Sequence, residues 1–134
     1  MGRHEQREQL FKLLFRVEFN AKEDMPEQVK LFFQDEDVEY TEKVMDTITE
    51  RYQKIQEKLP EIDQLLNEKA EGWNIARMGK VELTVLRIAV YEIMFDDDIP
   101  DTVAINEAIE IAKIYGQGTS GGFVNAVLAK FMNK

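Results

Sequence analysis

Apolar residues recur at intervals of three and four along almost the whole chain, and no stretch keeps an alternation of apolar and polar positions. This spacing is typical of amphipathic α-helices, whereas alternation would indicate β-strands. Glycine and proline number only seven and three, so few positions interrupt the pattern. The sequence therefore predicts an all-α fold of about seven helices, arranged as two small helical bundles that share one core.

The ends of the expected helices are marked by capping residues, prolines and glycines. The seven are a helix over about 5–19, a short one opened by Pro26, a long one capped by Thr41 and ended or restarted by Pro60, one around 62–66, one over about 80–95, one capped by Thr102 and stopped by Gly116, and one that starts within 118–122.

Residues 80–95 carry apolar side chains around nearly the whole circumference of the expected helix, with Leu86 near its middle. A helix of this kind is buried on all sides, so we expect it to lie at the centre. An irregular connection beginning at Gly72 precedes it. We expect a single domain over 1–134, with subdomains over about 1–70 and 79–134.

Composition excludes most catalytic chemistry. Of the 134 residues, 44% are apolar and 32% are charged, as in a soluble globular domain. There is no cysteine, which excludes thiol catalysis, and one histidine, His4, which leaves almost no material for a multi-histidine metal site or a Ser-His-Asp triad. The glycine-rich segment 118–122 lacks the lysine of a phosphate loop. We predict a protein that is not an enzyme and needs no cofactor or metal.

Charge is distributed unevenly along the chain. The net charge of −9 alone argues against a nucleic-acid partner. Residues 1–16 nevertheless carry +2 and residues 111–134 carry +3, whereas residues 17–110 carry −14. If the two ends meet, they form a mildly basic surface on an acidic body; otherwise they are ordinary solvated faces. No apolar run reaches the ~20 residues of a membrane span, so we expect a cytoplasmic protein with no membrane partner.

Cationic and aromatic residues share one edge of the first expected helix. Arg3, Arg7, Phe11 and Phe15 are four residues apart and form one row, with Lys12 and Arg16 on the next row. Guanidinium groups hold phosphates and aromatic rings stack unpaired bases, which is how single-stranded RNA is commonly bound. The alternative is that Phe11 and Phe15 belong to the core.

A second candidate surface lies at the start of the last expected helix. Thr119, Ser120, Gly121 and Gly122 offer free backbone N–H groups at a helix N-terminus, where anions bind favourably, and Phe123 stands beside them. A cap and a turn with no ligand fit the same residues equally well.

Three segments together resemble the NusB family of bacterial transcription antitermination factors. They are Val-Leu-Arg-Ile-Ala-Val-Tyr-Glu over 85–92, Pro100 with the run over 103–113, and Phe-Val-Asn-Ala-Val-Leu over 123–128. The arginine-containing start is similar as well. The resemblance covers essentially the whole chain and is strongest over 79–130.

This resemblance implies a non-enzymatic, two-bundle protein of the bacterial cytoplasm. It would bind single-stranded boxA RNA of nascent ribosomal transcripts together with the ribosomal protein NusE, join the RNA polymerase antitermination complex and suppress premature, Rho-dependent termination. By position, the RNA-binding residues would be Arg3, His4 and Arg7, and Phe123 with the loop before it. Phe15 and Glu82 would face NusE.

Two other readings stay open at this point. A related helical domain precedes a methyltransferase in some RNA-modifying enzymes, but a chain ending at residue 134 leaves no room for the cofactor-binding domain. The stronger rival is a helical adaptor whose acidic body binds a basic protein without direct RNA recognition. Salt-dependent RNA binding distinguishes an RNA-binding factor from this adaptor. The sequence does not decide whether the protein forms a homo-oligomer.

Overall fold

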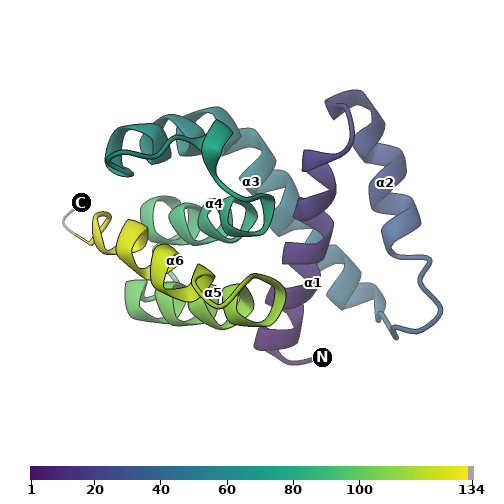
Figure 1. Cartoon of the computed structure of the whole chain (residues 1–134). Coiled ribbons are helices and arrows are strands. Elements are labelled where there is room, and N and C mark those ends of the chain that lie inside the picture. Colours follow the sequence, from purple (N-terminus) through teal and green to yellow (C-terminus); the bar gives the residue numbers. More distant parts are fainter. Residues whose placement is uncertain (133–134) are drawn as a thin grey trace. The chain divides into compact units, whose positions relative to one another are not determined.

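The structure is a computed structural model that describes residues 1–132, and within that range the chain is helical without any β-strand (Figure 1). The all-α prediction is confirmed. Six α-helices are present in this range instead of about seven. The elements are α1 (Arg3–Phe15), η1 (Arg16–Glu18), η2 (Lys22–Asp24), α2 (Met25–Phe32), α3 (Glu42–Lys69), η3 (Ile75–Arg77), α4 (Lys80–Phe95), α5 (Asp101–Tyr115) and α6 (Ser120–Ala129), where η marks a 3-10 helix.

The missing helix boundary is at Pro60, which lies inside α3. The prediction that Pro60 ends or restarts a helix is therefore wrong. A proline removes one backbone hydrogen bond, here to the Gln56 carbonyl, and costs about 3 kcal/mol or more. Side chains of α3 on both sides of Pro60 are fully buried, and each contributes roughly 1.5–3 kcal/mol. Their summed burial exceeds the cost of the proline. They are Ile48, Ile55, Ile62 and Leu66.

Two other helix starts test the predicted caps. The Thr41 hydroxyl oxygen accepts a hydrogen bond from the Val44 N–H at 3.1 Å, which confirms the N-cap of α3. Thr102 is wrong as a cap, because α5 begins at Asp101. The carbonyl of Pro100 already accepts hydrogen bonds from the N–H groups of residues 103 and 104, so the helix starts two residues earlier than expected. Val103, in the first turn of α5, is exposed.

The chain divides into two compact units, residues 1–56 and 57–134, with the division inside α3. The predicted subdomains, about 1–70 and 79–134, place the break at the connection between α3 and α4 instead. Lys134, counted above in the basic C-terminal segment, lies outside the described residues. No helix within the described range is long and apolar enough to cross a membrane.

In the first unit, α1 and α2 are joined by Arg16. Its Nη1 donates to both the backbone and side-chain oxygens of Gln28, at 3.2 Å each, and its guanidinium lies 5.3 Å from the centre of the Phe32 ring. Arg16 is thus a structural residue that holds two helices together. α1 starts at Arg3 and ends at Phe15, where a 3-10 turn replaces the predicted continuation to residue 19.

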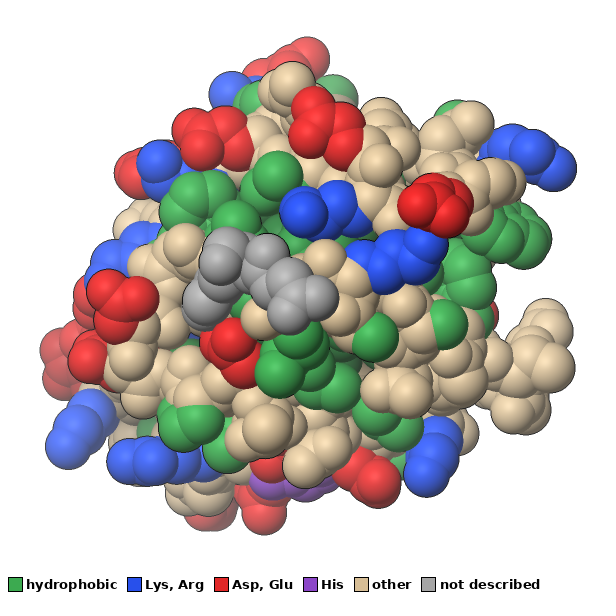
Figure 2. All heavy atoms as spheres, turned by 90° about the vertical axis from the view of Figure 1, so that its left-hand side faces the viewer, with side chains coloured by type: hydrophobic (Ala, Val, Ile, Leu, Met, Phe, Trp, Pro, Cys, Tyr) green, Lys and Arg blue, Asp and Glu red, His purple; other side chains and the backbone are tan. Residues whose placement is uncertain are grey.

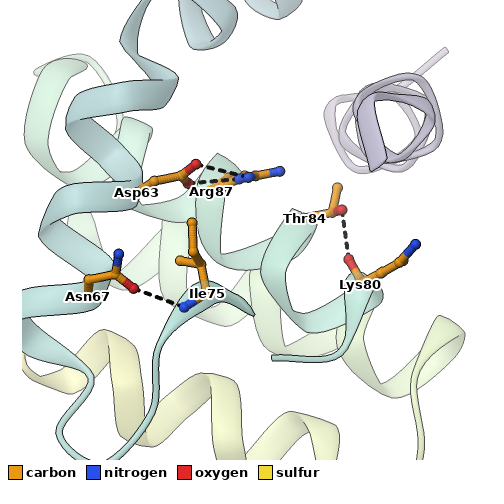
Figure 3. Close-up of polar contacts among 6 residues, drawn as sticks. All are labelled: Asp63, Asn67, Ile75, Lys80, Thr84 and Arg87. Carbon is orange, nitrogen blue, oxygen red and sulfur yellow. Dashed lines mark hydrogen bonds and ion pairs between the residues drawn. The ribbon is translucent and has the colours of Figure 1, made fainter. Parts of the chain in front are cut away.

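In the second unit, α4 is the central helix. It packs against both α5 and α6, which also pack on each other. Every residue from Leu83 to Ile93 is buried, as predicted for a helix apolar on nearly all sides. The buried Arg87 forms a two-pronged ion pair with Asp63 of α3, with both N–O distances at 2.9 Å (Figure 3).

Candidate nucleic-acid interface

A pocket of about 310 Å³ opens on the second unit, between the start of α4, the start of α6 and the connection after α3. Its lining residues are Trp73, Met78, Gly79, Glu82, Thr119, Ser120 and Phe123. The rings of Trp73 and Phe123 meet edge to face, with their centres 5.4 Å apart and their planes at 71°. Trp73 is 47% exposed, so the pocket offers aromatic surface to solvent.

Two hydrogen bonds hold the loop that carries Trp73, one to α3 and one to the residue directly after it. Gly72 has a φ of +79°, a left-handed conformation that favours glycine and turns the chain out of the helix. The Trp73 N–H donates to the Ala70 carbonyl at 2.9 Å. The Ile75 N–H donates to the Asn67 side-chain oxygen at 2.9 Å (Figure 3). These bonds hold the indole at the mouth of the pocket.

One cationic side chain lies against this aromatic pair, and two others contact neighbouring residues. The Arg77 guanidinium lies 5.7 Å from the centre of the Trp73 ring, a cation–π distance. Lys69 lies 5.5 Å from the Phe131 ring, and Lys130 pairs with Glu71 at 3.3 Å. Figure 2 shows one face of the molecule on which Lys and Arg side chains border hydrophobic ones, with acidic side chains also present.

A hydrogen-bonded chain links α4 to the loop before α6. The Ser120 hydroxyl accepts a hydrogen bond from the Gln117 N–H at 2.9 Å and donates one to Glu82 Oε1 at 2.5 Å. Ser120 is buried and Glu82 half-buried. Because Glu82 is 38 residues away in sequence, this contact fixes the start of α6 against the start of α4.

Two glycines make room for the bond between Glu82 and Ser120. A Cβ on Gly79 would collide with Glu82 Oε2. A Cβ on Gly116 would lie 2.5 Å from Ser120 Oγ and 2.7 Å from the Ala112 carbonyl oxygen. Gly116 has an ordinary φ of −97°, so space and not backbone conformation requires glycine there.

The predicted residues around α6 lie at this pocket. Thr119 is exposed and Phe123 is half-buried, and both line it. The expectation of a free N–H at Ser120 is wrong, because that group donates to the Gln117 carbonyl at 3.0 Å. Gly121 is buried against α5, where a Cβ would meet Lys113 at 3.3 Å. Ser120 and Gly121 therefore shape the loop from inside.

The predicted cationic residues of the first unit lie along α1. Arg3, His4 and Lys12 are exposed, and Arg7 is half-buried. His4 Nε2 lies 3.0 Å from Glu8 Oε1, so any positive charge on the imidazole is partly offset. Within residues 1–132, no group of three acidic or histidine side chains has the arrangement of a metal site.

The aromatic row of α1 is partly core. Phe11 is 3% exposed, which confirms the alternative that it is a core residue. Phe15 is half-buried, with its ring centre 5.7 Å from Phe11 and 5.0 Å from Phe19.

Tyr40 forms a hydrogen bond to α1: its hydroxyl donates to the side-chain oxygen of Gln9 at 2.6 Å. Burial raises the pKa of the Tyr40 hydroxyl above its usual value of 10, and the negative charge of Asp35 raises it further.

Sequence reasoning missed Trp73, Arg77 and the glycines 79 and 116 as parts of this site. The signal present was local: the only tryptophan of the chain directly follows a glycine in a connection, with an arginine four residues later. The pairing of Trp73 with Phe123, 50 residues apart, depends on tertiary packing and has no sequence signal of its own.

Comparison with known proteins gives concordant matches. The sequence matches the NusB family over residues 4–133. It is 50% identical to transcription antitermination protein NusB of Agathobacter rectalis, over 98% of this chain and 99% of that protein. The structure of T. maritima NusB is similar with a TM-score of 0.87 and 36% identity, covering 100% of this chain and 92% of that one. These matches describe antitermination proteins, which confirms the prediction that the protein is not an enzyme.

A more distant match adds to the likeness of fold. A crystal structure of antitermination factors NusB and NusE in complex with dsRNA contains a chain similar with a TM-score of 0.83 and 23% identity. The match covers 99% of this chain and 98% of that one. At this identity the likeness concerns the fold alone.

Proposed function

Because this chain belongs to the NusB family of transcription antitermination proteins, we propose that it binds single-stranded boxA RNA together with NusE. The bound pair joins the elongating RNA polymerase in the bacterial cytoplasm and suppresses premature termination on ribosomal transcripts. The observation that carries this proposal is the aromatic pocket beside residues 119–123, the loop that the resemblance assigns to RNA. A distant structural neighbour was crystallised with NusE and double-stranded RNA, which favours NusE and RNA as partner classes; the choice of single-stranded boxA is part of this proposal.

RNA contacts come from both units in this proposal. On α1, the charges of Arg3, Arg7 and Lys12 attract phosphates, and His4 adds a hydrogen-bonding ring. At α6, Thr119 and Phe123 contact the RNA. Each of two proteins then covers part of one RNA, so the ternary complex binds more tightly than either pair.

The NusE surface includes Phe15 and Glu82 in this proposal. Residues 17–110 carry a net charge of −14, which suits a basic partner. Phe15 offers a half-buried ring between Phe11 and Phe19. The Glu82 carboxylate is already bonded to Ser120, so its part at the NusE surface combines charge with the positioning of α6.

The test is RNA binding measured as a function of salt. Labelled boxA RNA is titrated with the protein, with and without NusE, and followed by fluorescence anisotropy between roughly 50 and 200 mM salt. We expect tighter binding with NusE and a preference over a scrambled RNA. Arg7→Ala should lower the slope of log affinity against log salt by about 0.7, the value for one phosphate contact on a single strand.

Lys54→Ala is the matched control for removing a charge. Lys54 is exposed and pairs with Glu50 at 2.9 Å, on a helix with no assigned RNA contact. Its loss should leave the salt slope unchanged. RNA binding without boxA preference, or an unchanged slope in Arg7→Ala, contradicts the proposal and favours the adaptor that binds only protein.

A further inference from the structure

We propose that the pocket between Trp73 and Phe123 takes up one unpaired nucleobase of the bound RNA, with Trp73 as a stacking platform. This inference rests on the proposed function and names a binding site within it. The steps below use the shape of the pocket, its polar groups and its surrounding charge.

The geometry of the aromatic pair suits a flat ring. The two rings stand at 71° to each other, with centres 5.4 Å apart. A planar base that stacks on one ring therefore meets the other edge to face, and both arrangements are favourable for aromatic groups. Trp73 is 47% exposed and Phe123 is half-buried, so the platform is accessible while the second ring is held in place.

The volume of the pocket suits a single nucleobase. At about 310 Å³, the pocket lies at the lower end of the range of small-molecule sites, roughly 300–1,000 Å³. A base extruded from the RNA strand fits that description, whereas a folded RNA element does not. Base–aromatic stacking of this kind tolerates any base, because every base has a π-face.

The polar groups of the pocket complement the edge of a base and its phosphate. Glu82 lines the pocket, and the bond from Ser120 engages Oε1, one of its two carboxylate oxygens. The other oxygen, Oε2, lies against Gly79, and a Cβ at that position would collide with it. A nucleobase presents N–H donors on its Watson–Crick edge that a carboxylate accepts. Arg77, over the indole, is a cation placed for the phosphate of the same nucleotide.

These groups favour a base over the apolar side chain of a protein partner. An apolar side chain would take the Glu82 carboxylate out of water without supplying a donor, which is costly for a charged group. A base brings both the aromatic face and the donor. Arg77, beside the indole, places positive charge at the pocket, which suits an RNA strand and not a cationic peptide.

The experiment uses the intrinsic fluorescence of Trp73, the single tryptophan of the chain. With NusE present, boxA RNA should quench this fluorescence at the same midpoint as the anisotropy titration, after subtraction of any NusE signal. A series of RNAs with one abasic nucleotide each should contain one position that removes most of the quenching. Trp73→Ala should weaken RNA binding about 5-fold to 150-fold, equivalent to the roughly 1–3 kcal/mol of stacking one base.

Conservative and matched variants separate stacking from folding. Trp73→Phe should retain most of the affinity, and Phe123→Ala should weaken binding with the salt slope intact, because Phe123 carries no charge. Leu31→Ala, at 45% exposure on α2, controls for loss of an exposed apolar side chain and should bind RNA normally. Thermal melts accompany each variant. If Trp73→Ala or Phe123→Ala fails to fold, quenching in the unaltered protein and its loss with one abasic RNA decide the question.

The outcomes distinguish this inference from the proposed function. Normal RNA binding with unchanged Trp73 fluorescence, or with quenching that no abasic position alters, overturns the pocket and leaves the proposed function standing. Saturating quenching by NusE without RNA, unaffected by later addition of RNA, shows that a protein occupies the pocket and overturns the inference. Absence of RNA binding with and without NusE overturns both.

Discussion

Gly116→Ala should be the most damaging of the glycine-to-alanine changes near the pocket. The added Cβ would lie 2.5 Å from Ser120 Oγ and 2.7 Å from the Ala112 carbonyl oxygen, so the start of α6 must shift. Overpacking of this kind costs typically 1–3 kcal/mol. The shift also weakens the hydrogen bond from Ser120 to the Glu82 carboxylate, a type worth roughly 1.5–3 kcal/mol. We expect a loss of about 2–4 kcal/mol in the free energy of unfolding.

Gly122→Ala is the matched control. Nothing lies within 4 Å of a Cβ at Gly122, which stands inside α6. Replacing a helical glycine by alanine stabilises a helix by roughly 0.5–1 kcal/mol, and less near its end. Urea unfolding followed by circular dichroism at 222 nm measures both variants. The steric argument fails if Gly116→Ala loses less than about 0.5 kcal/mol, or if the two variants are equally stable.

Three further changes test the core and the first unit. Leu86 is fully buried in α4, so Leu86→Ala should lower the free energy of unfolding by about 2–5 kcal/mol, measured by urea unfolding. A loss below about 0.5 kcal/mol would place Leu86 at the surface. Asp63→Ala should lose about 2–4 kcal/mol, because it leaves the buried Arg87 without its carboxylate, and a loss similar to that of an exposed ion pair would contradict this. The pKa of Tyr40 is raised above 10, so its stabilising contribution is complete below that pH and is lost as pH rises through the higher folded value. Tyr40→Phe should therefore lose less stability between about pH 9 and 11 than the unaltered protein does, whereas equal losses would refute the assignment.

Local patterns predicted most of the helices because each depends on neighbours in sequence. The apolar residues on nearly all sides of the segment 80–95 predict a central helix, and α4 confirms it. The Thr41 cap was also predictable, because the hydroxyl and the N–H it binds are three residues apart. Pro60 is the opposite case. Its local preference to end a helix is outweighed by burial on both sides, which depends on packing partners that sequence spacing does not reveal.

The candidate site was predictable only in its separate parts. The loop before Phe123 was identified through the family resemblance, and the aromatic row of α1 through its spacing. The pocket itself depends on residues from three segments, among them Trp73 and Glu82, which no local pattern joins. The hydrogen bond from Ser120 to Glu82 likewise spans 38 residues. The sequence hints at this bond only through Gly79 and Gly116, and the fold is needed to show that a Cβ at either position would collide with Glu82 or Ser120.

The position of Glu82 changes how a charge reversal at the NusE surface must be interpreted. Glu82→Lys places like charges opposite a basic partner, but it also removes the acceptor that holds Ser120 and the start of α6. Loss of NusE binding in that variant alone therefore has two explanations. Glu82→Gln separates them, because the amide keeps an oxygen acceptor and loses the charge. If charge at the surface matters, Glu82→Gln weakens NusE binding in calorimetry while its stability stays close to that of the unaltered protein; if only positioning matters, NusE binding stays normal.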